Sequence, residues 1–218
     1  YMLFKNVHYV IYYLIIIIVA IMIFMFAPVE KMTRLEEILL TYNFDFGWAP
    51  GYNVNCETGG AMGDKSTTVK TSHCSCFIYA LCKEIGLYIP SPPEYKQFHL
   101  ADRQLEWISS GDGIKNGWVD IGKHVPDNYI IAQKKANDGY LVIVGVTHDD
   151  GVNGHIGVVR PYRNIDFDII SSRGPIVMVS SSPNTIASYL DDEFRFNQAG
   201  FAHLNGRVRF FYNKNKVV

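Results

Sequence analysis

Residues 71–90 read TSHCSCFIYALCKEIGLYIP, and three of the chain's four cysteines fall within nine of these positions. Ser72 is a residue type that caps helices, and the apolar residues that follow recur at helical spacing. Gly86 stands where a helix ends in a left-handed residue, and Pro90 prevents continuation. This stretch therefore predicts an amphipathic helix that carries thiols at its amino end.

The three thiols differ in their expected chemistry. A cysteine is nucleophilic as the thiolate, and the positive end of a helix lowers the thiol pKa from about 8.5. Cys74 is expected at that end, whereas Cys76 lies about 200° further around the helix and cannot share its site. Cys82 falls on the apolar stripe and is expected to be a small buried hydrophobe.

A nucleophilic thiol also needs an imidazole, and the chain has seven histidines. His155 opens the predicted strand HIGVVR directly after GVNG. The sheet would fix such a histidine while the strand end leaves it accessible, so His155 is the leading candidate for the base.

The order of the remaining patterns predicts an α+β domain in which helices pack on a mainly antiparallel sheet. Three further helices are expected, and the glycine-rich segment 47–69 reads as a long surface loop. The expected helices are EKMTRLEEILLTYNF, SPPEYKQFHLADRQLEWISS and DNYIIAQKKAND, and the expected strands are 139–147, 155–160, 175–181 and 207–213.

Residues 10–27, VIYYLIIIIVAIMIFMFA, contain no charged side chain. Eighteen helical residues span roughly 27 Å, which is close to the thickness of a bilayer's hydrocarbon core. We therefore expect an N-terminal transmembrane helix, residues 1–30 as a membrane anchor and residues 31–218 as the catalytic domain. The alternative is a cleaved secretory signal, and the orientation in the membrane stays open.

Composition excludes some functions. The formal net charge is −1, and the Lys and Arg residues are scattered. Binding to nucleic acid needs a basic surface for the phosphates, so no nucleic-acid partner is expected. No cofactor and no metal are expected either.

The two motifs together resemble the NlpC/P60 superfamily of papain-like cell-wall peptidases. HCSCFIYALCKEIGLYIP is similar to its cysteine helix, and DGYLVIVGV…NGHIGVVRP to its histidine strand. The greatest similarity that we recognise is to the type VI secretion peptidoglycan amidase effectors of the first family. The resemblance covers about residues 70–213 and implies the papain-like NlpC/P60 fold.

The resemblance also implies roles for individual residues. Cys74 matches the nucleophile and His155 the base, and a residue of the next strand orients the imidazole, with Ser180 first and Asp166 or Asp168 behind it. His73 stands where the family has Asp or Asn, and Cys76 where it has Gly. We expect both residues to contact substrate.

The resemblance implies hydrolysis of a peptidoglycan stem-peptide amide, the γ-D-glutamyl to diamino acid bond, through an acyl-enzyme. Tyr52, in the glycine-rich loop, is expected to line the cleft. The implied location is the periplasm or the cell exterior, and a toxin of this kind would have an immunity protein.

Three alternatives stay open at this stage. Cys56, His73, Cys74 and Cys76 could ligate zinc, although they lack a paired C-x₂-C spacing. The domain could instead be a non-catalytic, membrane-anchored cell-wall-binding subunit with structural thiols. A disulfide between Cys56 and Cys76 is a further option in an oxidising compartment.

The acidic run at 191–193 is interpreted as a solvated helix face.

Overall fold

The structure is a computed structural model, and the chain divides into two units, Tyr1–Met32 and Thr33–Val218. The residues that it describes are 12–19, 21–22, 31–42, 48, 51–63, 73–95, 99–147, 154–181, 184–194 and 207–218.

In the first unit, residues 12–19 and 21–22 are helical, and their large apolar side chains are exposed. No helix within the described residues is both long enough and apolar enough to cross a membrane. Residues 10–11, 20 and 23–27 of the expected span lie outside the described part, so the membrane helix stays a prediction.

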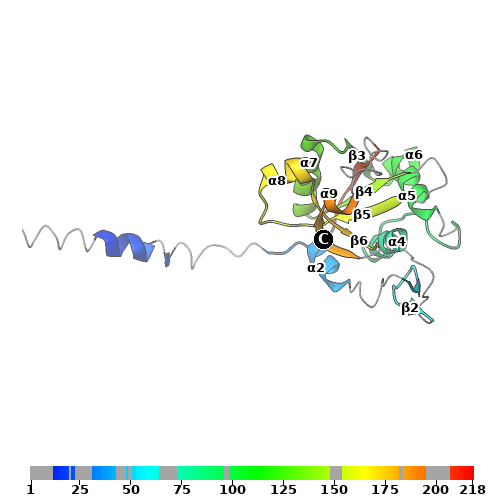
Figure 1. The fold of residues 1–218 in the computed structure, drawn as a ribbon, viewed down its shortest axis with the longest axis horizontal. Helices are drawn as coiled ribbons and strands as arrows, with labels where there is room; N and C mark the ends of the chain where they lie inside the picture. The colour runs from blue at the N-terminus through cyan, green and yellow to red at the C-terminus, as the bar shows by residue number, and fades with distance from the viewer. Residues whose placement is uncertain are drawn as a thin grey trace, which may run out of the picture. The chain divides into compact units, whose positions relative to one another are not determined.

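The second unit is built on an antiparallel sheet, which agrees with the predicted α+β class (Figure 1). In the described part of the chain, six strands are arranged in the order β3-β8-β4-β5-β6-β7. Their bounds are Trp118–Lys123 (β3), Tyr140–Val146 (β4), His155–Val159 (β5), Ile176–Val179 (β6), Thr185–Tyr189 (β7) and Arg209–Lys216 (β8). The central strands β4, β5 and β6 are almost wholly buried, because both faces of the sheet are covered.

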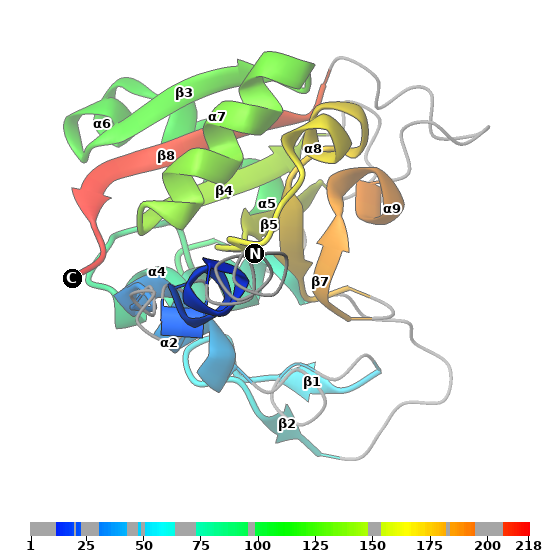
Figure 2. The same ribbon diagram turned by 90° about the vertical axis from the view of Figure 1, so that its left-hand side faces the viewer.

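Helices α5 (Leu100–Ser109) and α7 (Pro126–Asn137) cover opposite faces of this sheet. Neighbouring residues of a strand point to opposite faces. Gly145 of β4 lies against Leu105 of α5, whereas Val144 pairs with Phe210, whose ring contacts Tyr129 of α7. Figure 2 shows α7 lying across β8 and β4 on the face towards the viewer.

Helix α4 (Cys74–Glu84) packs against β5 and α5. His73 is its N-cap residue, one position after the predicted Ser72, which lies outside the described residues. At the other end Gly86 has φ 76°, and its N–H bonds to the Lys83 carbonyl while Leu87 N–H bonds to Cys82. This is a Schellman motif, so the predicted left-handed helix end is present.

The remaining elements are short, and several were not expected from the sequence. Helix α2 matches the first predicted helix, with Thr33 capping Glu36 N–H. The segment predicted as a loop contains a small hairpin of β1 and β2. The bounds are Arg34–Thr41 (α2), Asn53–Val54 (β1), Ala61–Met62 (β2), Gly111–Lys115 (α6), Phe167–Arg173 (α8) and Leu190–Phe194 (α9).

Candidate functional site

Cys74 is the first residue of α4, and its side chain lies at the helix's positive end. The His73 carbonyl accepts the Phe77 N–H at 2.9 Å, which starts the helical hydrogen-bond ladder at this point. The N–H groups of a first helical turn have no carbonyl acceptor within the helix and point out of its end. Only 6% of Cys74 is exposed, so the thiol lies in a largely water-free environment.

His155 is the first residue of β5 and pairs with Val146 of β4. One quarter of its side chain is exposed (25%), and its ring lies 5.0 Å from the ring of Phe194. The ladder to β4 fixes the backbone of this histidine, while the strand end leaves part of the imidazole accessible. The local geometry is the one expected from the sequence.

The His155 side chain hydrogen-bonds to both Cys74 and Glu193. Its Nε2 atom lies 3.5 Å from Glu193 Oε1. Burial opposes the charged imidazole, but these two partners outweigh burial and raise the pKa of His155 from 6.5 to about 9. A thiol, an imidazole and a carboxylate are thus connected in series.

Glu193 belongs to α9, and sequence reasoning missed it. The interpretation of residues 191–193 as a solvated face is wrong for this residue, because only 11% of its side chain is exposed. It accepts hydrogen bonds from the hydroxyls of Ser181 at 2.7 Å and Thr185 at 2.5 Å. Burial raises its pKa, but the bonds from His155, Thr185 and Ser181 lower the pKa below 4.5 overall, so the group is a carboxylate.

The residues predicted to orient the imidazole have other neighbours. Ser180 is fully buried, and its hydroxyl lies 3.3 Å from Asn184 Oδ1. Asp166 is the exposed N-cap of α8, where it accepts the Asp168 N–H at 2.9 Å, and Asp168 is exposed in the first turn. The carboxylate beside His155 belongs instead to Glu193 of α9, which follows β7 in the chain.

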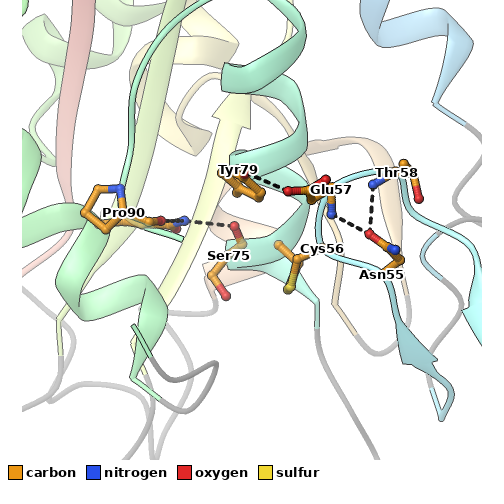
Figure 3. The surroundings of a disulfide bond; sticks show 9 residues. Asn55, Cys56, Glu57, Thr58, Ser75, Tyr79 and Pro90 are labelled. Carbon is orange, nitrogen blue, oxygen red and sulfur yellow. Dashed lines mark hydrogen bonds between the residues drawn. A yellow bond between two sulfur atoms is a disulfide. The ribbon is translucent and has the colours of Figure 1, made fainter. Parts of the chain in front are cut away.

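Cys76 forms a disulfide with Cys56, the bond that the sequence left open. The bond ties the β1–β2 hairpin to α4. Glu57 adds an ion pair with Lys83 at 2.9 Å, and it accepts the Tyr79 hydroxyl at 3.4 Å, a contact that Figure 3 shows. Both sulfurs are therefore unavailable as zinc ligands. Among the described residues, no cluster of three or more His, Cys, Asp or Glu side chains could hold a metal ion.

Besides Cys76, His73 and Tyr52 were predicted to contact substrate, and they lie next to α4 and β1 in the chain. His73 precedes Cys74 and is 2% exposed. Tyr52 is half-buried and immediately precedes β1, in the hairpin that the disulfide attaches to α4. Cys82 is completely buried, and burial raises its pKa, as expected of an inert thiol.

The arrangement has the parts that acyl transfer by a thiol requires. Cys74 offers a thiol at a helix start, His155 an imidazole that is protonated at neutral pH, and Glu193 a carboxylate in contact with that imidazole. The helix start supplies N–H groups for a developing oxyanion. Comparisons of the sequence with models of known protein families and with curated proteins give no match.

Proposed function

We propose that the domain is a cysteine amidase that hydrolyses a stem-peptide amide of peptidoglycan. The observation that carries this proposal is the imidazole of His155, hydrogen-bonded to the Cys74 thiol on one side and to the Glu193 carboxylate on the other. A thiol with structural duties alone has no need of an oriented, charged imidazole, so the pairing favours an enzyme over a binding module.

The mechanism follows from the positions of the three groups. In the resting enzyme His155 holds the proton of Cys74, and the thiolate sulfur attacks the amide carbonyl carbon. The oxyanion is stabilised by N–H groups at the start of α4, and the imidazolium then donates its proton to the leaving amine. Water, activated by His155, hydrolyses the thioester and restores the free thiol. Glu193 keeps the imidazole in position throughout.

The substrate class rests on the resemblance to the NlpC/P60 superfamily. From the same resemblance we propose that the bond cleaved is the γ-D-glutamyl to diamino acid amide and that the domain has the NlpC/P60 fold. The α+β architecture is compatible with this substrate class and with this fold, because the cysteine lies at the start of a helix and the histidine at the start of a strand.

The domain is proposed to work in the periplasm or outside the cell, anchored by residues 10–27 and inhibited by an immunity protein. The Cys56–Cys76 disulfide supports an oxidising compartment. Fractionation of cells tests the anchor, and the full-length protein is expected in the membrane fraction. Recovery of the uncleaved chain in the soluble fraction without detergent would contradict it.

Incubation with purified peptidoglycan, followed by mass spectrometry of the fragments, tests the activity. We expect the wild-type chain to release stem-peptide fragments. Cys74→Ala and His155→Ala should lose this activity by at least about a thousandfold, because each removes a group that acts in the acyl-transfer step.

Two variants serve as controls. Cys82→Ala and His124→Ala change a thiol and an imidazole outside the site, and both should retain activity. Retention of turnover by a folded Cys74→Ala chain, or loss of turnover in His124→Ala alone, would show that the nucleophile or the base is assigned to the wrong residue.

A further inference from the structure

Helix α5 carries two buried polar side chains that mechanism alone does not explain. Asp102 is 8% exposed and Gln104 is 0% exposed, although both lie on a helix whose other polar residues face solvent. A buried polar group costs free energy unless it is hydrogen-bonded. The hydrogen-bond partners of these two side chains therefore show which segments of the chain they keep in place.

Gln104 binds the beginning of α4. Its Nε2 donates to the Ser75 carbonyl at 3.0 Å and to the Pro90 carbonyl at 3.1 Å. Figure 3 labels these two acceptors, Ser75 on the first turn of α4 and Pro90 in the segment that follows the helix. Ser75 is the residue after the nucleophile, so this bond fixes the helix end that carries Cys74.

Asp102 binds the beginning of β5. Its Oδ2 accepts the Gly154 N–H at 3.0 Å, and Gly154 is the residue before His155. The contact is close enough that a Cβ on Gly154 would meet Asp102 Oδ1 at 2.3 Å. The imidazole of His99 also lies near this carboxylate, with its Nδ1 atom 3.7 Å from Oδ2.

Residues two positions apart on a helix point about 200° away from each other. Asp102 and Gln104 therefore reach in different directions from one rigid element, to the residue before the base and to the residue after the nucleophile. We propose that they are positioning residues, through which α5 holds the Cys74 helix and the His155 strand at the separation that the thiol–imidazole contact requires. This inference rests on the proposed function.

The test measures alkylation of Cys74 by iodoacetamide in the full chain, without reductant, from pH 5 to pH 10. In Asp102→Ala and Gln104→Leu we expect alkylation at neutral pH to slow about tenfold, because each variant loses the hydrogen bond that holds one of the two elements, Gly154 before β5 or Ser75 in α4. The acidic limb of the rate profile should move towards that of an ordinary thiol. Asp102→Asn should stay within about twofold of wild type, because its amide oxygen still accepts the Gly154 N–H.

Arg103→Ala is the matched control. It lies between the two residues on α5, pairs with Glu106 on the exposed surface and should leave the profile unchanged. Gly154→Ala tests the same contact from the strand side, since the added methyl must displace the Asp102 carboxylate, and its profile should change as that of Asp102→Ala does. It replaces Asp102→Ala if that variant does not fold.

Folded Asp102→Ala, Gln104→Leu and Gly154→Ala chains with the wild-type profile would overturn the inference. Asp102→Asn as slow as Asp102→Ala would also overturn it, since the acceptor would then not matter. Alkylation does not depend on substrate. A wild-type chain whose Cys74 is alkylated rapidly but which releases no peptidoglycan fragments therefore contradicts the proposed substrate and leaves the positioning role to be decided by the variants.

Discussion

At the scale of single residues, the proposed chemistry depends on the charge of His155. Burial favours a neutral imidazole, but the hydrogen bonds to Cys74 and Glu193 favour the imidazolium and raise its pKa to about 9. The histidine therefore carries a proton at neutral pH. In the proposed mechanism that proton is the counter-charge of the Cys74 thiolate and is later donated to the leaving amine.

The pH dependence of catalysis follows from this charge. We expect kcat/KM to fall on an alkaline limb near pH 9, where the imidazolium loses its proton, and on an acidic limb that belongs to the thiol–imidazole pair. Glu193→Gln removes a group that raises the pKa of His155, so its alkaline limb should move to lower pH. Its activity should fall on the order of a hundredfold. Peptidoglycan release across pH measures both.

Ser180→Ala is the control for this prediction, because the family resemblance implies for Ser180 the orienting role that we propose for Glu193. Its buried hydroxyl contacts Asn184, so its loss should leave the alkaline limb in place. An unchanged limb in Glu193→Gln together with a shifted limb in Ser180→Ala would return the orienting role to the serine.

Glu193 could not be found from local sequence signals. Its run, LDDEF, has the polar composition of a solvated face, and Asp192 does lie on the surface, paired with Arg173. The burial of Glu193 depends on Ser181, Thr185 and His155, which come from separate elements. Cys74 and His155, by contrast, were predictable because a helix start and a strand start are local features.

At the scale of secondary-structure elements, the same distinction holds. The predicted helices and strands that the structure contains have strong periodicity or a run of β-branched residues, as in β4 and β5. Strands β3 and β7 were missed: Trp118–Lys123 contains an Asp, a Gly and a Lys, and no residue of Thr185–Tyr189 is fully buried. These strands form the two edges of the sheet, where side chains are less buried and the sequence has less need of a regular pattern of apolar residues.

The hairpin of β1 and β2 is too short to be stable by itself, and the disulfide attaches it covalently to α4, in addition to the contacts of Glu57 with Lys83 and Tyr79. The two cysteines are 20 positions apart in the sequence, so the bond is worth about 3 kcal/mol through restriction of the unfolded chain. Cys56→Ser should therefore lower the melting temperature by roughly 6–12 °C. Thermal unfolding followed by circular dichroism measures the shift.

Reductant provides the control for the disulfide prediction. Dithiothreitol should lower the melting temperature of the wild-type chain and leave that of Cys56→Ser unchanged, because the variant has no disulfide to lose. Equal melting temperatures of wild type and Cys56→Ser under non-reducing conditions would show that the bond contributes nothing to stability.

At the scale of the whole molecule, the site links elements that are distant along the chain. Helix α4, strand β5 and helix α9 each supply one of the three groups, so ionic contact among these groups exists only in the folded domain. Their protonation must therefore be coupled to the free energy of unfolding.

The sign of this coupling differs for the two ionised partners. The pKa of His155 rises from 6.5 to about 9 on folding, so its contribution is complete below pH 6.5 and is lost as the pH rises through 9. For Glu193, burial raises the pKa but its hydrogen bonds lower it below 4.5 overall. Its contribution is therefore present above pH 4.5 and is lost as the pH falls through the lowered pKa.

The difference in unfolding free energy between wild type and Glu193→Gln isolates this contribution, because the other titrating groups are common to both chains. We expect the difference to be largest between about pH 4.5 and 6.5, and to shrink towards pH 9 and again under strongly acidic conditions. Urea unfolding at a series of pH values measures it. A difference that is constant across this range would mean that Glu193 stabilises the domain through its hydroxyl partners alone, and that its contact with His155 carries no charge.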